Sequence, residues 1–306
     1  MTKFRPSTAL EAQHELFAFT QAREGLLFLA SLTKAPEGPT IPLQRQQATA
    51  LRNGPTYFVT EDMLKLAMHA AESMPLLPIK PSDLISPSGV CIFEKGTIVV
   101  DLHGRDTSIC GFIWHPAADR NGVDGVVWSF ISDTDDPRDY YMGDRGKASI
   151  PGGCPRLLQL QLRFDRFGEI PHSAAETAVA TGSTEERAKQ NITIMRTLPL
   201  CLFVLMGQTI AVTTTERAQR HVRRRLARKG FPVSTIKVVR LRRLRAKKAR
   251  EGDAQEVDWS HRWIVNGHWR MQPTNDGPKR IWIMPFVKGP EDKALVLKDT
   301  VHVLER

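Results

Sequence analysis

The sequence predicts an α+β fold: N-terminal helices packed on a mixed or antiparallel sheet, then a basic helical segment and C-terminal β-strands. Two changes of pattern predict this order. Helical periodicity in the first part gives way at Val90 to short alternating runs of β-branched and aromatic residues. A strongly cationic stretch then precedes a block rich in Trp and His. The length of 306 residues, with 41% hydrophobic and 25% charged residues, is typical of a folded chain with one large or two ordinary domains.

The first helix is predicted by a capping box at Thr8 and Glu11, whose side chains can satisfy the free N–H groups of a helix start. Apolar residues continue its pattern to about Leu32, and Gly25 in the middle allows two shorter helices instead. Residues 34–57 are rich in Pro and Gly and predict a loop.

A second helix is predicted to begin at Thr60, a favourable N-cap residue followed by two acids that suit the positive end of the helix dipole. It stops before Pro75. Turn signals at Lys95-Gly96 and His103-Gly104 then separate short strands, which indicates an antiparallel meander. The predicted strands are Val90–Phe93, Thr97–Leu102, Ser108–Trp114 and Val123–Ile131.

The second half of the chain alternates helix and strand signals. Ser183 and Glu186 form another capping box, which opens a helix that Pro199 should kink or end. The following run Leu200–Met206 remains apolar, so a buried helix pair is expected. Arg217–Arg228 is expected to be helical, whereas Val238–Leu244 fits either a strand or a helix face. Three closing strands are expected at His261–Arg270, Arg280–Val287 and Ala294–Leu304. The domain plan is a helical region at 1–80, a central core at 81–210, a basic segment at 211–258 and a β element at 259–306 that forms one compact unit with the core.

Several classes of protein are excluded by composition. No run approaches the ~18 apolar residues that a membrane span needs, and the N-terminus lacks a signal core. The four cysteines form no CxxC pair, so a closed zinc site is not expected. Cys91, Cys110 and Cys201 lie in apolar runs and are expected to be buried. We therefore expect a soluble protein of the cytoplasm.

Positive charge is concentrated in Arg217–Arg250, which holds fifteen Lys and Arg and no acid. The whole chain carries +10, so the remainder sums to −5. Local charge density of this kind is what binding to a phosphate backbone requires, which predicts RNA or the ribosome as a partner. A solvated basic helix is the alternative. The candidate contact residues are Arg220, Arg223, Arg224, Arg225, Arg228, Arg240, Arg242, Arg243 and Arg245.

Acids follow the last strand of the meander at Asp133, Asp135 and Asp136, where a metal-dependent nuclease would place its carboxylates. An exposed turn requires the same residues, and the calcium-loop pattern fails. The turn is the favoured interpretation, with the metal site as the alternative.

The C-terminal block contains Arg262, Gly267, His268, Trp269 and Arg270. Arg can hold a phosphate with two hydrogen bonds, while Trp and His can stack on bases or on a peptide. Packing of the tryptophans into a sheet core is the alternative, and it would leave Arg262, His268 and Arg270 on the functional face. No nucleophile motif, P-loop or dinucleotide fingerprint is present, so the sequence argues against an enzyme, and no cofactor is expected.

The stretches Ser260–Met271 and Lys279–Val287 resemble a C-terminal signature of phage and mobile-element proteins. They are similar to the second type V-A anti-CRISPR family, which suppresses Cas12a production. Gly267, His268 and Trp269 match that signature, whereas Arg262 and Arg270 match only by type.

This resemblance implies a counter-defence protein that recognises a nascent polypeptide of an effector such as Cas12a and causes translation-dependent loss of its mRNA. Binding would be driven by the basic segment and read by the strand at Arg262–Arg270. The alternatives are the metal-dependent nuclease and a DNA-binding regulator with a helix-turn-helix at Arg217–Arg228. A homodimer is also possible, because the apolar helices could hide a dimer surface.

Overall fold

The structure, a computed structural model, describes residues 3–33, 36–75, 78–100, 106–118, 122–136, 156–169, 197–231, 235–242, 262–265, 267–275, 277–283, 286–288 and 295–296. The chain divides into two compact units, Met1–Arg242 and Arg243–Arg306, which are described separately.

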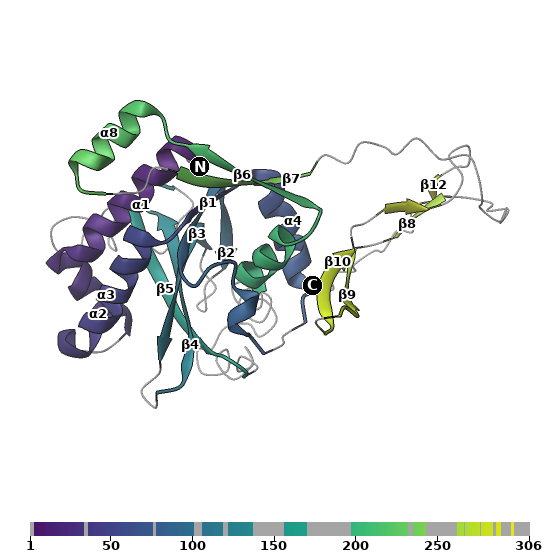
Figure 1. Cartoon of the computed structure of the whole chain (residues 1–306), viewed down its shortest axis with the longest axis horizontal. Coiled ribbons are helices and arrows are strands. Elements are labelled where there is room, and N and C mark those ends of the chain that lie inside the picture. The colour runs from purple at the N-terminus through teal and green to yellow at the C-terminus, as the bar shows by residue number, and fades with distance from the viewer. Residues whose placement is uncertain are drawn as a thin grey trace. The chain divides into compact units, whose positions relative to one another are not determined.

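The first unit contains a seven-stranded mixed sheet with helices on both of its faces (Figure 1). Its helices are α1 (Pro6–Gln21), α2 (Arg23–Thr33), α3 (Glu37–Asn53), α4 (Glu61–Glu72), the short 3-10 helix η1 (Pro81–Asp83), a helix at 197–206 and α8 (Arg220–Arg228). Its strands are β1 (Thr56–Val59), β2 (Gly89–Val100), β3 (Asp106–Ala118), β4 (Asp124–Asp133), β5 (Leu157–Arg166), β6 (Ala211–Arg217) and β7 (Thr235–Leu241). The predicted α+β class is confirmed.

The strand order is β5-β4-β3-β2-β1-β7-β6. Strands β2 to β5 pair antiparallel in sequence order. This confirms an antiparallel meander, although the first two predicted strands are both part of β2 and β5 was not predicted. Strand β1 is parallel to both β2 and β7, so the sheet is mixed. Strand β6 pairs antiparallel with β7 and forms one edge of the sheet.

One face of the sheet is covered by α1, α3 and α8. Apolar side chains of these helices form one cluster with Phe58, Ile92, Ile113 and Val238, which alternate along their strands with residues of the other face. Polar side chains tie α1 and α3 to this cluster, since Gln13 donates to the Leu51 carbonyl (2.6 Å) and Gln47 donates to Ser129 (2.8 Å).

The opposite face is aromatic. The ring of Phe112 lies 5.7–6.2 Å from those of Phe93, Trp114, Trp128, Phe130 and Phe203. Such tilted and edge-to-face pairs favour each other beyond the area that they bury. Phe203 belongs to the helix at 197–206, which confirms the predicted buried helix there. This helix contacts α4 through Thr197, whose hydroxyl donates to the Ala71 carbonyl (2.9 Å).

Two predictions for the N-terminal helices need correction. The N-cap of α1 is Arg5 rather than Thr8, whose hydroxyl instead accepts the Arg5 N–H (2.8 Å) from the first turn. The predicted loop at 34–57 is wrong because α3 occupies Glu37–Asn53. Pro39 lies in the first turn, where the N–H has no partner within the helix, and only Pro42 removes a helical hydrogen bond.

The division of the first predicted helix is confirmed, although the break lies at Ala22. Gly25 is required there because a Cβ would approach the Phe19 carbonyl oxygen to 2.0 Å. The predicted turn at Lys95-Gly96 is wrong. Strand β2 continues through it, with a bulge between Ile92 and Thr97 that absorbs the extra residues.

The second unit contains short strands. They are β8 (Arg262–Val265), β9 (His268–Gln272), β10 (Lys279–Ile283), β11 (Phe286–Lys288) and β12 (Leu295–Val296). Strands β9 and β10 form a two-stranded antiparallel sheet, and β11-β8-β12 form a three-stranded one. The first closing strand that the sequence predicts is therefore two strands in different sheets, divided at residues 266–267.

Among the helices that the structure describes, none has the length and apolar character needed to cross a membrane.

Candidate nucleic-acid interface

Helix α8 carries the cationic surface of the first unit. Within its nine residues Val222 and Leu226 are buried (1% and 2% exposed) and join the apolar cluster of α1. Figure 1 shows α8 beside α1. Arg225 extends this contact through an ion pair with Glu11 of α1. Packing on α1 therefore decides which side of α8 faces solvent, because a helix this short is not stable in isolation.

The C-terminal end of α8 is fixed by a Schellman motif. Gly230 has a φ of +68°, a backbone conformation that favours glycine. Its N–H donates to the Ala227 carbonyl (3.0 Å), and the Phe231 N–H donates to the Leu226 carbonyl (3.0 Å). Phe231 is buried against the rings of His14 and Phe17. The helix is therefore held at its end as well as along its buried side.

Three arginines form a row on the exposed side of α8. Arg220, Arg224 and Arg228 recur every four residues, and the helical period places them opposite Val222 and Leu226. All three are exposed, and their side chains make no ion pair or hydrogen bond with any residue that the structure describes. The row extends about 12 Å along the helix at 1.5 Å per residue. We call these residues the arginine row.

The remaining predicted cations are placed differently. Arg223 is half-buried on α8. Arg240 on β7 donates to Thr214 (2.9 Å) and to Glu216 (2.6 Å) of β6, so its charge is neutralised locally. Arg242 is exposed just after β7, with its N–H donating to the Ile210 carbonyl (2.7 Å). Arg243 and Arg245 lie outside the described residues. The basic segment is thus not helical throughout, since β7 lies within it.

His14 lies beside the end of α8. Burial lowers the pKa of its imidazole, and the nearby charge of Lys229 lowers it further. Arg52, at the end of α3, donates to the Gly230 carbonyl (3.4 Å) and lies over the Phe17 ring. This end of α8 is therefore cationic, and the neutral imidazole of His14 is favoured there.

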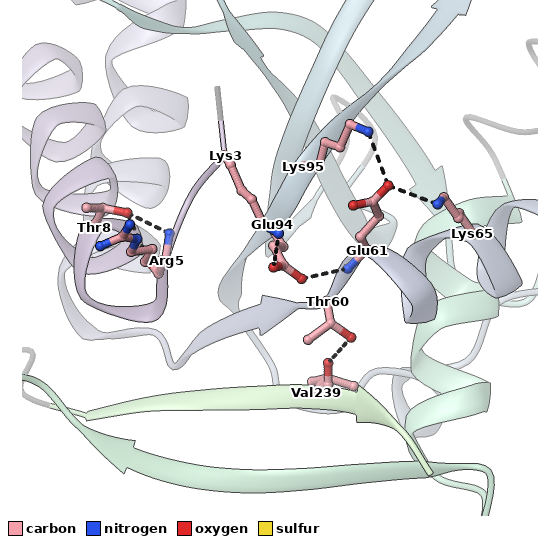
Figure 2. A network of polar contacts seen from close by, with 9 residues as sticks. All are labelled: Lys3, Arg5, Thr8, Thr60, Glu61, Lys65, Glu94, Lys95 and Val239. Carbon is pink, nitrogen blue, oxygen red and sulfur yellow. Dashed lines mark hydrogen bonds and ion pairs between the residues drawn. The ribbon is translucent and has the colours of Figure 1, made fainter. Parts of the chain in front are cut away.

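The lysines near helix α4, unlike the arginine row, contact acidic side chains (Figure 2). Glu61 in its first turn accepts contacts from Lys65 (2.9 Å) and Lys95 (3.2 Å), which lower the pKa of its carboxyl. Glu94 accepts the Glu61 N–H (3.0 Å) and a contact from Lys3 (3.0 Å). Helix α4 begins after Thr60 as predicted, but the Thr60 hydroxyl donates to the Val239 carbonyl, and Glu94 caps the helix instead. Each of these lysines has an acidic partner.

The acids proposed as a metal site are engaged in local contacts. Asp133 is buried at the end of β4 and faces Arg156 at 3.4 Å, and its Oδ1 accepts the Asp135 N–H (3.2 Å). Asp136 accepts a hydrogen bond from Ser108 (3.0 Å). Within the described ranges, no group of three or more His, Cys, Asp or Glu residues could hold a metal ion. The observed contacts are those of a structural turn.

Two residues of the predicted C-terminal site, His268 and Trp269, lie on β9. His268 and Arg270 are exposed, whereas Trp269 between them is half-buried and its ring lies 5.2 Å from that of Trp282 on β10. Trp282 is 4% exposed. On β9 and β10 the expected division is therefore observed, with Trp269 and Trp282 packed together and His268 and Arg270 exposed, whereas the side chains of Arg262 and Trp263 lie outside the description. Gly267 precedes the strand. Arg262 lies on β8, separate from β9, so these five residues do not share one strand.

The sequence predicted the three residues of the arginine row among other candidate cations. It did not predict the contacts that distinguish these three from the others. Arg220, Arg224 and Arg228 differ from Arg225 and Arg240 only through Glu11 and Glu216, and Glu11 is over two hundred residues away in the chain. The apolar pair Val222 and Leu226 was the one available signal, because its spacing marks the buried side of a helix. The edge position of β6 had no signal of its own.

Comparison with known proteins gives one finding. No protein-family model matches the chain, and no curated protein matches it. A solved structure titled "Crystal structure of AcrVA2" is similar, with a TM-score of 0.36 and 14% sequence identity over 89% of this chain and 85% of that one.

Proposed function

We propose that this chain is a counter-defence regulator of a phage or mobile element that binds RNA at the translating ribosome through the arginine row. In this proposal it recognises a nascent effector polypeptide, of which Cas12a is the first candidate, and lowers the level of the corresponding mRNA. The arginine row carries the RNA half of the proposal. The resemblance of the Gly267–Trp269 block to the type V-A anti-CRISPR signature motivates the polypeptide half.

The arginine row suits a phosphate backbone for three reasons. Its guanidinium groups have no acidic partner among the described residues, so binding a phosphate breaks no ion pair. Arginine presents a planar fork of donors that matches two phosphate oxygens. The row is held on a helix fixed by Val222, Leu226 and the Schellman motif, so little order is lost on binding.

A helix-turn-helix is not formed by α8, since it lies between β6 and β7 in the described part of the chain. The DNA-binding alternative therefore lacks the geometry on which it was based. The local contacts of Asp133 and Asp136 likewise favour no nuclease chemistry. We propose no second function.

The test is an affinity pull-down of the tagged full chain from a translating bacterial lysate, with and without RNase and puromycin. Recovery of ribosomes and one specific mRNA, lost on puromycin, is the expected result. The matched controls are a row variant, Arg220→Gln/Arg224→Gln/Arg228→Gln, and a paired-lysine variant, Lys3→Gln/Lys65→Gln/Lys95→Gln. Each removes three positive charges, and only the row variant should lose RNA.

A single stable protein partner that RNase leaves unchanged, recovered equally by both variants, would contradict the RNA half. RNA recovered despite puromycin would contradict the nascent-chain half and leave direct RNA binding in place.

A further inference from the structure

Strand β6 is an edge strand with no cover among the described residues. It pairs with β7 over seven consecutive positions without a bulge. The first pair is Ala211 with Leu241, and the last is Arg217 with Thr235. Its other side has no strand neighbour in the sheet order. Backbone N–H and C=O groups alternate between the two sides of a strand, so about half of those in β6 point away from β7. Such groups form a template for another strand.

The opposite edge of the sheet, β5, shows how this protein protects a strand. Helices α1 and α2 pack against β5, and its end is paired, since Phe167 forms a bridge with Ile79 and the Gly168 N–H donates to the Ile79 carbonyl (2.9 Å). Among the described residues, no strand or isolated bridge pairs with the outer side of β6. Thr213, Thr214 and Thr215 are exposed, and their β-branched side chains favour extended backbone. No proline interrupts the strand, although Glu216 lies opposite Ile236, on the sheet face that carries the apolar cluster.

The charge around β6 selects the kind of strand that it can accept. Arg217 is exposed at one end of β6, and Arg242 is exposed at the other end, beside Ala211 and its partner Leu241. Neither arginine side chain contacts an acid among the described residues. The one acid of β6, Glu216, is already paired with Arg240. The two arginines lie about 20 Å apart at 3.3 Å per residue, which is the length of a six- or seven-residue strand.

We propose that the free edge of β6 binds an extended acidic segment of another polypeptide as an added strand. Backbone hydrogen bonds to β6 would supply affinity, and carboxylates near the two ends of the segment would meet Arg217 and Arg242. A second copy of this chain fits less well, because edge-to-edge pairing of β6 would bring two arginine rows toward one interface. The inference rests on the polypeptide half of the proposed function and needs no RNA binding by α8.

The first measurement is amide hydrogen exchange of the free full chain at two concentrations. Outward amides of β6 should exchange at least about tenfold faster than those bonded to β7. Protection that rises with concentration, together with a doubled mass, would overturn the proposal in favour of a second copy. Protection at every concentration would overturn it in favour of a cover from this chain.

The second measurement adds the probe peptide acetyl-Asp-Glu-Val-Thr-Val-Thr-Val-Glu-Asp-amide and a control peptide with Asn and Gln for the acids. The acidic peptide should slow exchange of the outward β6 amides by about tenfold, and Arg217→Glu/Arg242→Glu should weaken its binding by about tenfold. Of Thr213→Pro and Thr214→Pro, the variant that keeps the melting temperature of the wild type is used. That variant should not bind the acidic peptide. Equal binding of both peptides, or binding unaffected by these variants, would overturn the proposal.

The row variant separates this inference from the RNA half. It should lose RNA and still bind the acidic peptide. Loss of RNA with no peptide protection in either protein would overturn the β6 inference alone, whereas peptide binding without any RNA binding would overturn only the RNA half.

Discussion

Helices α4 and α8 lie on opposite faces of the same sheet, and both are anchored by buried apolar residues. Around α4 the cations have partners, because Glu61 contacts Lys65 and Lys95, and Glu94 contacts Lys3. Among the described residues, Arg225 is the one cation of α8 that contacts an acid, Glu11 of α1. The segment 217–250 has no acid of its own, so its exposed side keeps an unbalanced row of arginines. The comparison shows that the placement of acids, rather than the number of cations, distinguishes a surface of unpaired arginines from one of paired lysines.

The strongest way to break this comparison is to detach α8. Leu226→Ala removes a buried side chain and should lower the free energy of unfolding by about 2–5 kcal/mol. RNA binding should weaken as well, because the row loses its fixed orientation. Met63→Ala on α4, where the side chain is 0% exposed, should destabilise by a similar amount without changing RNA affinity. Denaturant melts and RNA titration at low temperature, where both variants are folded, measure the two effects.

An acidic residue added to α8 should give its arginines a partner, as Glu61 does for the lysines around α4. Ala227 is exposed and lies one turn from Arg223 and Arg224. Ala227→Glu places a carboxylate beside the row and should weaken RNA binding about tenfold, or about 1.4 kcal/mol, at 0.1 M salt. Ala118→Glu, at an exposed strand end, makes the same change of net charge. Equal weakening by the two variants, seen by fluorescence anisotropy, would mean that net charge rather than the row governs binding.

Replacing Glu61 tests the other half of the comparison, the paired lysines around α4. The pKa of Glu61 is lowered by Lys65 and Lys95, so its contribution to stability is present above the ordinary value near 4.5 and is lost as pH falls through the lowered one. Glu61→Gln should therefore reduce the loss of stability below pH 4.5 and leave RNA binding nearly unchanged. Thermal melts between pH 3 and 7 check this prediction. If the variant and the wild type lost the same stability below pH 4.5, the contacts of Glu61 with Lys65 and Lys95 would contribute nothing to stability.

The smallest expected effect concerns His14. Burial is the main cause of its lowered pKa and the charge of Lys229 is the second, so Lys229→Gln should raise the pKa of His14 only part of the way to 6.5. Because the folded pKa is lowered, stability from the neutral imidazole is lost as pH falls below 6.5, and the variant should lose less of it. Proton NMR titration of the imidazole measures the shift. An unchanged pKa of His14 in the variant would show that the charge of Lys229 does not act on His14.

The sequence predicted those parts of the fold that follow from local pattern. The antiparallel pairing of β2 to β4, the α4 start at Thr60 and the burial of Cys91, Cys110 and Cys201 were predicted correctly, whereas the division of β2 at Lys95-Gly96 was not. Helix α3 was missed because its prolines lie mostly in the first turns, where they cost little. Strand β1 was missed because it is only four residues long and fully buried between β2 and β7, so its character depends on distant partners.

The candidate site was predicted in composition and not in geometry. Arg220, Arg224 and Arg228 were named together with six other arginines, and only the tertiary contact with Glu11 and the packing of Leu226 separate them. The division of the tryptophan block was predicted because Trp269 alternates with His268 and Arg270 along a strand. A break at residues 266–267 that places Arg262 on another strand depends on pairing in the folded chain and had no signal in the pattern.

The most direct test of the arginine row is the salt dependence of binding to a fluorescent single-stranded RNA, measured for the wild type, the row variant and the paired-lysine variant. Three phosphate contacts contribute about 2 to the slope of log affinity against log salt, and about 100-fold in affinity at 0.1 M. The row variant should lose that slope, and the paired-lysine variant should keep the slope of the wild type. An equal loss in both variants would contradict the account, because it would show that RNA responds to net charge and not to the unpartnered row on α8.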